Sequence, residues 1–543
     1  MNILHLDQIT KFKAIFFLSL FFSLQLFSQS WDYINFQSAT DNSNHQVLGA
    51  TIDDNNTVYA FQQTTQFPQT KLIRKYINGV AQTTTSTNFP TSFNAGSNIG
   101  ANFITSGSNH IYVVGEGTIY KIDHSLSSTT NIRQITATNG AVKVYSVEYY
   151  NNELYISGFV YKNNNSSQAT FNFGGSYSAV NITQSEAFIA KYSTTGNCIL
   201  FKTIGVSGGN RATDLNVDYT GNMYATYIST TTNVRVLKRF DSSGNFDSAW
   251  GTKQNTIVSG DHCDIKIDPD GNAIYHVINK YPNNLIEKYE TSSTGNLLLT
   301  KSVRGSHSIT QIALNNCGIL SATGISQPST SVSRATPQGS FFSISSDKNI
   351  GGITHLWAAN ANGQGSIGVA TLPDSNGKFN IMAKYNGRSI TINGQQTHTS
   401  PTYTGLNGKI FIARVDDINS FTNAKASASF VNPDRIIQKN SKYGPGDVAI
   451  LCLSDDLLVN GSISTCANRY FIGLSEFDLN AWTEITPLHS DWVQPLQSPP
   501  NNIKITDFLP QGYQLRPNIV YKFRLAVGMP WDSVDLFFMI ECC

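Results

Sequence analysis

Residues 215–224 read LNVDYTGNMY, and residues 265–275 read IKIDPDGNAIY. In both stretches an alternating apolar run breaks at a polar Gly-Asn turn and resumes with apolar and aromatic residues, which is the pattern of a β-hairpin. Repetition of such a hairpin at about 40 to 70 residues indicates a propeller or a solenoid before any other fold is considered. The weaker copies are centred on Tyr59, Tyr112, Tyr155, Leu320 and Ile381.

A second strand signature follows each copy of the first and ends in a basic residue beside an aromatic or apolar one. In three units a Gly-Asn turn comes next, at Gly196, Gly244 and Gly295, where glycine allows the positive φ of a chain reversal. Each unit therefore supplies about four short strands, which make one propeller blade. The copies are IRKY at 73–76, IYKI at 119–122, FIAKY at 188–192, VLKRF at 236–240, LIEKY at 285–289, FIARV at 411–415 and a degenerate FFSI at 341–344.

Two longer stretches carry a resemblance to a known family. Residues 171–224 combine FNFGG, EAFIAKYSTTGN, ILFKTIG and VDYTGNMY, and they resemble the SBBP-type propeller repeats of bacterial secreted and surface proteins. Residues 389–416, from SITINGQQ to KIFIARVD, resemble the same unit. The resemblance implies a fold rather than an activity, because one fold hosts many functions.

The N-terminal end of the repeat region predicts how the array closes. Residues 31–36, WDYINF, resemble the strand after the Gly-Asn turn in other units, such as ILFKTI at 199–204. An N-terminal strand that completes the last blade would remove the two open edges of a linear array. We therefore expect an all-β fold with a seven-bladed β-propeller at residues 31–424, a polar linker at 425–446 and a small β-sandwich at 447–543.

The first 30 residues are typical of a cleaved signal peptide. Lys11 and Lys13 precede an apolar run at 14–27, and Ser28 and Ser30 offer small residues for cleavage. The run is too short to span a bilayer, and no later stretch is long and apolar enough to do so. We expect a secreted or bacterial cell-surface protein without a transmembrane segment.

The charge of the chain argues against nucleic acid as a partner. The net charge is +1, and charged residues make up only 13% of the sequence. Basic residues pair only locally, at Arg74-Lys75 and Lys238-Arg239, whereas a nucleic-acid binder needs a basic surface. A surface rich in amides and hydroxyls is instead typical of exported β proteins.

The seven cysteines fall into two groups. Three are isolated within propeller strands, where a small buried hydrophobe is commoner than a reactive thiol: Cys198, Cys263 and Cys317. Four crowd into the C-terminal module, and such crowding in an exported protein suggests disulfides: Cys452, Cys466, Cys542 and Cys543. We expect a bridge between Cys452 and Cys466, and the pairing of the last two cysteines stays open.

The C-terminal module reads as short strands rich in β-formers, without helical periodicity. Its three tryptophans have two interpretations: a platform on which sugars stack, if they are exposed together, or the core of a small domain, which is the commoner role of large aromatics. These residues are Trp482, Trp492 and Trp531. The module resembles terminal modules of secreted bacterial proteins, which implies an accessory domain and nothing sharper.

Motifs of catalysis and metal binding are weak. GVSGG at 205–209 matches the nucleophile pattern G-x-S-x-G, but it lies between two strands rather than at a strand-to-helix turn. Asp268 opens a segment that resembles a calcium loop, yet Asn279 stands where the closing carboxylate belongs, so a hairpin turn is favoured. His262 and His307 could face a channel as ligand or base. We assign no catalytic, cofactor-binding or metal-binding residue and expect no cofactor.

These observations favour a secreted or surface-exposed noncatalytic binding or scaffold protein, monomeric, whose propeller loops recognise an extracellular protein or glycan. The alternative is a polysaccharide-active hydrolase or lyase with its site in the propeller funnel, and a third possibility is an adhesin without a small ligand. A cluster of ionisable side chains that converge at the channel would favour the enzyme, and an exposed apolar patch on the sandwich would favour the adhesin.

Overall fold

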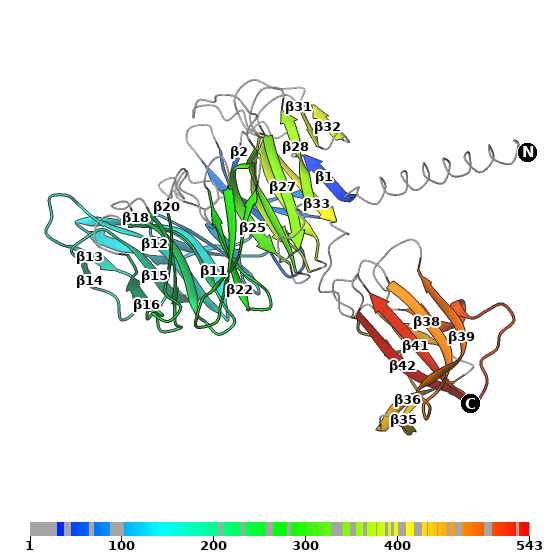
Figure 1. Cartoon of the computed structure of the whole chain (residues 1–543). Coiled ribbons are helices and arrows are strands. Elements are labelled where there is room, and N and C mark those ends of the chain that lie inside the picture. Colours follow the sequence, from blue (N-terminus) through cyan, green and yellow to red (C-terminus); the bar gives the residue numbers. More distant parts are fainter. Residues whose placement is uncertain are drawn as a thin grey trace, which may run out of the picture. The chain divides into compact units, whose positions relative to one another are not determined.

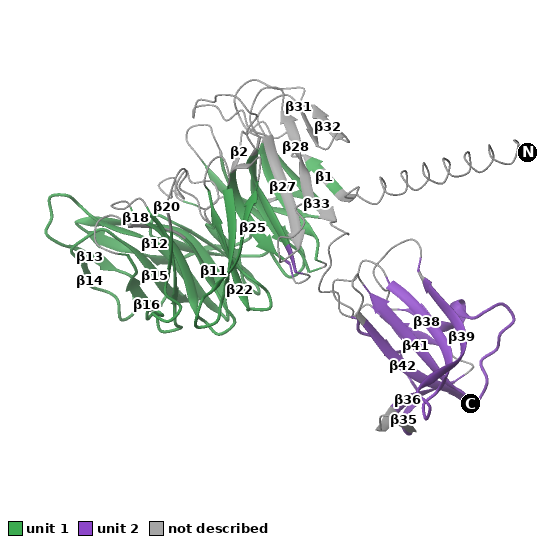
Figure 2. Cartoon of the chain, viewed as in Figure 1, with its two compact units in different colours: residues 1–314, 320–419 green, residues 315–319, 420–543 purple. Residues whose placement is uncertain are grey.

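The computed structural model describes residues 30–36, 45–64, 70–86, 89, 102–205, 210–229, 234–256, 264–279, 284–303, 306–315, 318–326, 340–347, 354–361, 366–375, 377–385, 389–392, 396–399, 409–416, 426–431, 433–441, 444–452, 457–461, 470–493, 502–527 and 532–541. These residues form strands and one short 3-10 helix, η1 (Ile505–Phe508), which confirms the all-β class (Figure 1). The chain forms two compact units, one of residues 1–314 and 320–419 and one of residues 315–319 and 420–543 (Figure 2). Within the described ranges, none of the helices could cross a membrane.

Unit 1 contains a series of antiparallel sheets, which we number in chain order. Sheet one holds β2 (His45–Ile52), β3 (Val58–Thr64), β4 (Lys71–Ile77) and β5 (Val80–Ser86), and sheet two holds β6 (Ile104–Ser106), β7 (His110–Gly115), β8 (Thr118–Asp123) and β9 (Thr129–Gln134). Sheet three holds β11 (Gly140–Tyr150), β12 (Glu153–Lys162), β15 (Glu186–Ser193) and β16 (Cys198–Thr203), and sheet four holds β17 (Asn210–Val217), β18 (Met223–Ser229), β19 (Val234–Phe240) and β20 (Thr252–Thr256).

The remaining sheets of unit 1 continue the series. Sheet five holds β21 (Ile265–Ile267), β22 (Ala273–Ile278), β23 (Asn284–Glu290) and β24 (Leu297–Val303). Sheet six holds β25 (Ser306–Leu314), β26 (Ile319–Ser326), β27 (Ser340–Asp347), β28 (Thr354–Ala361), β31 (Ser389–Ile392) and β32 (Gln396–Thr399). Sheet seven holds β29 (Ser366–Pro373), β30 (Phe379–Tyr385), β33 (Lys409–Asp416) and β1 (Ser30–Phe36).

We call the first strand of each sheet its inner strand. Each inner strand contacts the inner strand of the next sheet, in the order β2, β6, β11, β17, β21, β25 and β29, and β29 in turn contacts β2. A buried apolar cluster joins the last sheet to the first, with Val47 and Ala60 packed against Val369, Met382 and Ile412. The series of sheets therefore returns to its beginning.

The N-terminal strand belongs to the last sheet. β1 pairs antiparallel with β33, with Ser30 opposite Asp416 and Phe36 opposite Phe411. This confirms the predicted place of residues 31–36. Because the strand comes from the opposite end of the chain, it ties the first residues of unit 1 to the last and covers the edge of β33.

The two sequence signatures meet as cross-strand pairs. In sheet four, Tyr224 on β18 lies opposite Arg239 on β19, and the guanidinium carbon is 5.8 Å from the centroid of the ring. The attraction between a cation and an aromatic face explains why the aromatic residue of the first signature accompanies the basic residue of the second. Lysines make the same pair with Tyr59 (Lys75, 5.8 Å), Tyr155 (Lys191, 5.4 Å) and Tyr275 (Lys288, 5.2 Å).

The hairpin turns follow the predicted chemistry. In the turn between β17 and β18, Asp218 Oδ1 accepts the backbone N–H groups of Thr220 and Asn222, each at 2.9 Å. The segment that opens with Asp268 is a hairpin turn between β21 and β22, as favoured over a calcium loop. Gly271 in this turn has φ +71°, and a Cβ there would lie 2.3 Å from the Tyr219 ring, so only glycine fits.

Two hairpins inserted between strands of one sheet pair with strands outside that sheet, which the sequence did not predict. β31 and β32 lie between β30 and β33 in the chain, yet β31 pairs with β28 of sheet six. Likewise β13 (Ala169–Asn172) and β14 (Val180–Ile182) lie between β12 and β15, and β13 pairs with β10 (Thr136–Thr138), which follows β9 of sheet two. β10, β13 and β14 thus form a separate three-stranded sheet, whereas β31 and β32 extend sheet six.

Unit 2 contains two sheets. The larger has the order β35 (Arg435–Ser441), β36 (Gly444–Cys452), β42 (Asp532–Glu541), β41 (Val520–Val527), β38 (Tyr470–Asp478) and β39 (Thr483–Trp492). The smaller has the order β34 (Ser429–Phe430), β37 (Leu458–Asn460) and β40 (Ile503–Lys504). In the larger sheet most neighbouring strands pair antiparallel, whereas β36 and β42 pair parallel.

The expected linker at residues 425–446 needs a correction. This segment contains β34, β35 and the start of β36, so the C-terminal unit begins upstream of residue 447. Pro445 is the second residue of β36 and lies opposite Asn440 of β35, ahead of the residues of β36 that pair with β42, and a strand tolerates proline at such a position.

Deleting residues 31–36 is expected to leave β33 as an open edge, so that unit 1 associates through it. Size-exclusion chromatography with light scattering should show oligomers or aggregates. As a matched control, residues 30–36 can be placed directly after Asp416 through a short Asn-Gly turn, which lets the same strand pair with β33 as a hairpin. A deletion variant that stays monomeric would contradict the closing role of β1.

Candidate functional site

Ionisable side chains gather on the inner strands of sheets three to five. We call Glu148, Asp214, Asp264 and Lys266 the inner-strand cluster. Asp214 joins three sheets: its Oδ1 accepts the Ser146 hydroxyl of β11 at 2.8 Å, and its Oδ2 accepts the Ile265 N–H of β21 at 3.0 Å. One carboxylate therefore holds neighbouring inner strands together.

Asp264 repeats this role one sheet further along. Its Oδ2 accepts the backbone N–H of Ile312 on β25 at 2.5 Å. Burial raises the pKa of Asp264 well above its ordinary value, and the hydrogen-bonded Asp214 carboxylate raises it further against the opposing charge of Lys266. A hydrogen bond between two carboxyl groups needs a shared proton, so Asp264 holds that proton more firmly than an exposed aspartate does.

Lys266 and Glu148 complete the cluster, and both are half-buried. Burial opposes the charge of Lys266, but Asp264, Glu148 and Asp214 together raise the pKa of its ammonium group. Burial also raises the pKa of Glu148, while Lys266 lowers it. Carboxyl groups with separated proton affinities beside a cation could transfer protons. In the part of the chain that the structure describes, no group of three or more His, Cys, Asp or Glu side chains is placed so that it could hold a metal ion.

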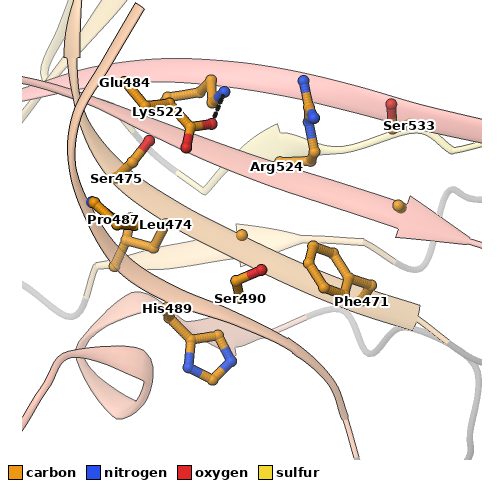
Figure 3. Close-up of a pocket in the computed structure, with 12 residues that line it drawn as sticks. Phe471, Leu474, Ser475, Glu484, Pro487, His489, Ser490, Lys522, Arg524 and Ser533 are labelled. Atoms are coloured by element: carbon orange, nitrogen blue, oxygen red, sulfur yellow. Dashed lines mark hydrogen bonds and ion pairs between the residues drawn. The ribbon is translucent and has the colours of Figure 1, made fainter.

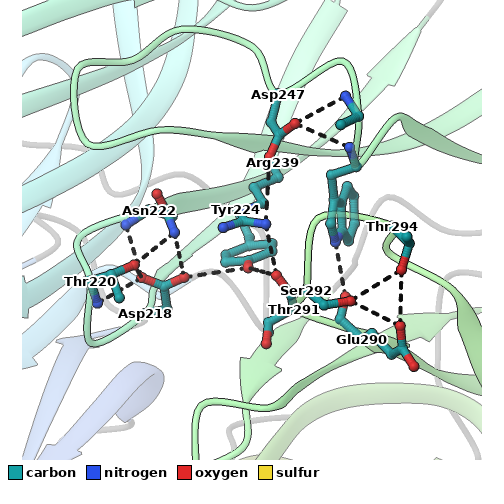
Figure 4. Close-up of polar contacts among 12 residues, drawn as sticks. Asp218, Thr220, Asn222, Tyr224, Arg239, Asp247, Glu290, Thr291, Ser292 and Thr294 are labelled. Atoms are coloured by element: carbon teal, nitrogen blue, oxygen red, sulfur yellow. Dashed lines mark hydrogen bonds and ion pairs between the residues drawn. The ribbon is translucent and has the colours of Figure 1, made fainter.

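A groove of about 450 Å³ lies between the turns of sheets four and five. Figure 4 shows the polar contacts of several of its residues. The Arg239 guanidinium donates to the Thr291 carbonyl at 2.7 Å, and the Tyr224 hydroxyl lies 3.4 Å from both that carbonyl and Asp218 Oδ2. Glu290 accepts hydrogen bonds from its own turn, including the Ser292 hydroxyl at 2.9 Å. The carboxylates of this groove thus accept hydrogen bonds within the turns, which favours a structural role. We call the contacts of Tyr224 and Arg239 with the Thr291 carbonyl the clasp between sheets four and five.

The equivalent clasp joins sheets one and two. Lys75 Nζ donates to the His124 carbonyl at 3.3 Å, and the Tyr59 hydroxyl donates to Asp53 Oδ2 at 3.1 Å. His124 follows Asp123 just as Thr291 follows Glu290 in sheet five. Because the same contacts recur at a second junction, they belong to the repeat rather than to one binding site.

A second groove, of about 500 Å³, crosses β38, β39, β41 and β42 in unit 2 (Figure 3). Arg524 donates through Nε and Nη2 to the two oxygens of Asp535, at 2.6 and 2.8 Å, and Lys522 pairs with Glu484. Ser475 lies in the same groove, and its buried hydroxyl has no hydrogen-bond partner among the described residues. This groove therefore contains a polar group that its own fold leaves unsatisfied.

The predicted disulfide residues are only partly within the described ranges. Cys452 ends β36 and is buried, whereas Cys466, Cys542 and Cys543 lie outside the described residues. The Cys452–Cys466 bridge therefore stays a prediction.

Of the three repeat-region cysteines, the structure describes only Cys198. It is a free thiol whose pKa burial raises to about 11, which confirms its interpretation as a buried hydrophobe. Cys263 and Cys317 lie outside the described residues.

The other candidate motifs carry little chemistry. Residues 206–209 of the GVSGG motif and His262 lie outside the described residues, as does the side chain of His307. Trp482 is half-buried and packs against Phe477 and Phe537, with ring centroids 5.4 and 5.5 Å apart, which favours the core interpretation over the sugar platform. Trp531 and the side chain of Trp492 lie outside the described part of the chain. Sequence reasoning missed the inner-strand cluster, whose members are far apart in the chain and share no motif.

Comparison with known proteins gives no family and no curated relative: no protein-family model and no curated protein sequence matches the chain. Solved structures match with low similarity. A Dos1 propeller has a TM-score of 0.39 and 9% identity, covering 71% of this chain and 95% of that one. A puromycin hydrolase has a TM-score of 0.41 and 10% identity, covering 76% and 60%. A luciferin-regenerating enzyme has a TM-score of 0.33 and 14% identity, covering 60% and 96%. Such values carry no argument about function.

The raised pKa of Asp264 predicts a pH dependence of stability. A carboxyl that binds its proton more tightly in the folded state stabilises the fold at low pH, and this contribution disappears as pH rises through the folded-state pKa. Asp264→Asn keeps an acceptor for Ile312 and stays neutral. The melting temperature of the variant, relative to wild type, should therefore rise as pH increases above about 4, the ordinary aspartate value.

Asp241→Asn is a control for which the pH dependence of stability, relative to wild type, should have the opposite sign. Hydrogen bonds, above all from the Asn245 backbone, lower the pKa of Asp241, so its contribution is present at neutral pH and is lost on acidification. Its variant should be less stable than wild type at pH 7 and equal to it in acid. Parallel pH curves for wild type and Asp264→Asn, by differential scanning calorimetry, would contradict the assignment.

Proposed function

We propose that unit 1 is a seven-bladed β-propeller of SBBP-like repeats and that unit 2 is a β-sandwich. The succession of inner strands from β2 to β29, the return contact of β29 with β2, and the pairing of β1 with β33 support the propeller. The ring contact between Phe430 of the smaller sheet and Phe538 of the larger, 5.6 Å between centroids, supports two packed layers in unit 2.

We propose further that the protein is a secreted or cell-surface binding protein without catalytic activity, which recognises an extracellular glycan or protein. The observation that carries this proposal is the groove of unit 2, where a buried hydroxyl lacks a partner beside fixed donors and acceptors. The carboxylates of the described turns and two of those in the inner-strand cluster bind backbone N–H groups of the fold instead. The signal-like segment at the N-terminus supports export.

A polysaccharide-active enzyme is the second candidate, and the inner-strand cluster favours it. The pKa of Asp264 is raised, and Asp214 beside it accepts hydrogen bonds, which is the arrangement of a general acid next to a second carboxyl group. Both carboxyls also hold backbone N–H groups of the next sheet, and this structural use makes the binding function the better supported one.

A glycan array probed with the full chain tests the first proposal. We expect binding to a restricted set of neutral glycans, and we expect the bound glycan to remain intact. Incubation of each hit with the protein, followed by mass spectrometry of the sugar, separates the two candidates. Cleavage that Asp214→Asn abolishes would replace the binding proposal by the enzyme, and an array without hits would contradict glycan recognition and leave a protein partner.

The predicted Cys452–Cys466 bridge belongs to the same proposal of export. A bridge that closes a loop of about fifteen residues stabilises a domain by about 3 kcal/mol on the chain-entropy model. Reducing agent should therefore increase hydrogen exchange in β36 and β38 and leave the exchange of unit 1 unchanged. In thiol mapping of the unreduced protein, the free Cys198 is the internal reference. Free Cys452 and Cys466 thiols in the unreduced, exported protein, found by mass spectrometry, would show that the bridge is absent.

A further inference from the structure

The floor of the unit 2 groove is made of small residues on one face of the sheet. In the register of β38 with β41, Phe471 lies opposite Ala526, Gly473 opposite Arg524 and Ser475 opposite Lys522. Alternate residues of a strand point to the same face, so these six share it. A Cβ on Gly473 would lie 3.4 Å from the Arg524 Cβ and 3.5 Å from the Phe471 ring, which are ordinary van der Waals contacts, so a side chain fits here without a clash and would take up part of the groove.

Charged residues border the groove, and their positive and negative charges are equal in number. Arg524 binds Asp535 through two parallel hydrogen bonds of 2.6 and 2.8 Å, and Lys522 pairs with Glu484 (Figure 3). Asp535 is the only hydrogen-bond partner of Arg524 among the described residues, so its Nη1 keeps donors for a ligand. Two cations and two anions leave no net charge to attract an anionic ligand.

One polar group inside the groove lacks a partner. Ser475 is 3% exposed, and its Oγ makes no hydrogen bond with any described residue. A buried hydroxyl without a partner destabilises the fold, and a hydroxyl or ordered water brought by a ligand would satisfy it. This feature points to a ligand rich in hydroxyl groups.

An aromatic ring lies at one end of the same face. Phe471 is half-buried and lines the groove. Aromatic rings offer a flat apolar face to the C–H groups of a sugar ring. A groove of this volume is also within the range of small-molecule sites.

We infer that the groove on the larger sheet of unit 2 is a binding site for a neutral oligosaccharide. Phe471 contacts the sugar face, Arg524 and the two carboxylates hydrogen-bond its hydroxyls, and the Ser475 hydroxyl gains its missing partner. The inference deepens the proposed function, on which it rests, by assigning glycan recognition to unit 2 rather than to the propeller loops.

Gly473→Val and Ser475→Ala test the site in the full chain. Valine fills the floor of the groove and favours strands over glycine, so the fold should keep or gain stability. Ser475→Ala removes an unsatisfied hydroxyl and should also leave the melting temperature unchanged or raise it. Ile436→Ser, at an exposed position on β35 outside the groove, is the matched control.

Isothermal titration with cellohexaose, xylohexaose, mannohexaose and laminarihexaose measures binding, with hexagalacturonate as the anionic comparison. We expect wild type and Ile436→Ser to bind at least one neutral probe more tightly than hexagalacturonate. Gly473→Val should lose at least tenfold in affinity, and Ser475→Ala should weaken binding without loss of stability.

Three outcomes would overturn the inference. Equal affinities of wild type and Gly473→Val would place the sugar elsewhere and leave the proposed binding function standing. Tighter binding of hexagalacturonate would make the site one for anions. No binding of any neutral probe would remove the inference together with glycan recognition as the function.

Discussion

The backbone of the inner strands needs hydrogen-bond partners at the junctions between sheets, and the rest of unit 1 depends on how they are supplied. An inner strand has a ladder partner on one side only, so N–H groups on its other side would be buried without an acceptor. Asp214 and Asp264 provide acceptors for Ile265 and Ile312 of the following sheets. Neutral side chains do the same elsewhere: Asn279 for Ile309, and Gln311 for Thr371.

This solution explains why charge collects where burial is greatest. A carboxylate accepts backbone N–H groups more strongly than an amide does, but its charge must be balanced when water is excluded. Lys266 supplies that balance between sheets three and five, and the proton held by Asp264 removes a second negative charge. The cluster thus follows from the junctions themselves, without any requirement from catalysis.

The sequence could predict what is local in the chain. The alternation around Tyr224 and Tyr275, the Gly-Asn turns and the basic residue of the next strand determine single sheets, and residues 31–36 resemble the strand that they replace. It could not predict which strand a hairpin joins, because β13 pairs with β10 in a separate sheet and β31 pairs with β28 of sheet six through contacts that leave no local pattern. The linker prediction for residues 444–446 was wrong for a related reason: these residues begin β36 ahead of the part that pairs with β42, and the first residues of a strand tolerate proline.

The candidate sites could not be predicted from the sequence either, because their residues are brought together from distant parts of the chain. Asp214, Asp264 and Glu148 come from three different sheets, and Ser475, Arg524 and Glu484 come from three different strands of unit 2, so no spacing along the chain announces either group. What separates the two groups is satisfaction of their polar atoms. In unit 1, Asp214 and Asp264 are bound to the backbone that they stabilise, and a ligand would have to compete with the fold for them. In unit 2 the Ser475 hydroxyl lacks a described partner, so a ligand there would add hydrogen bonds without taking any from the protein.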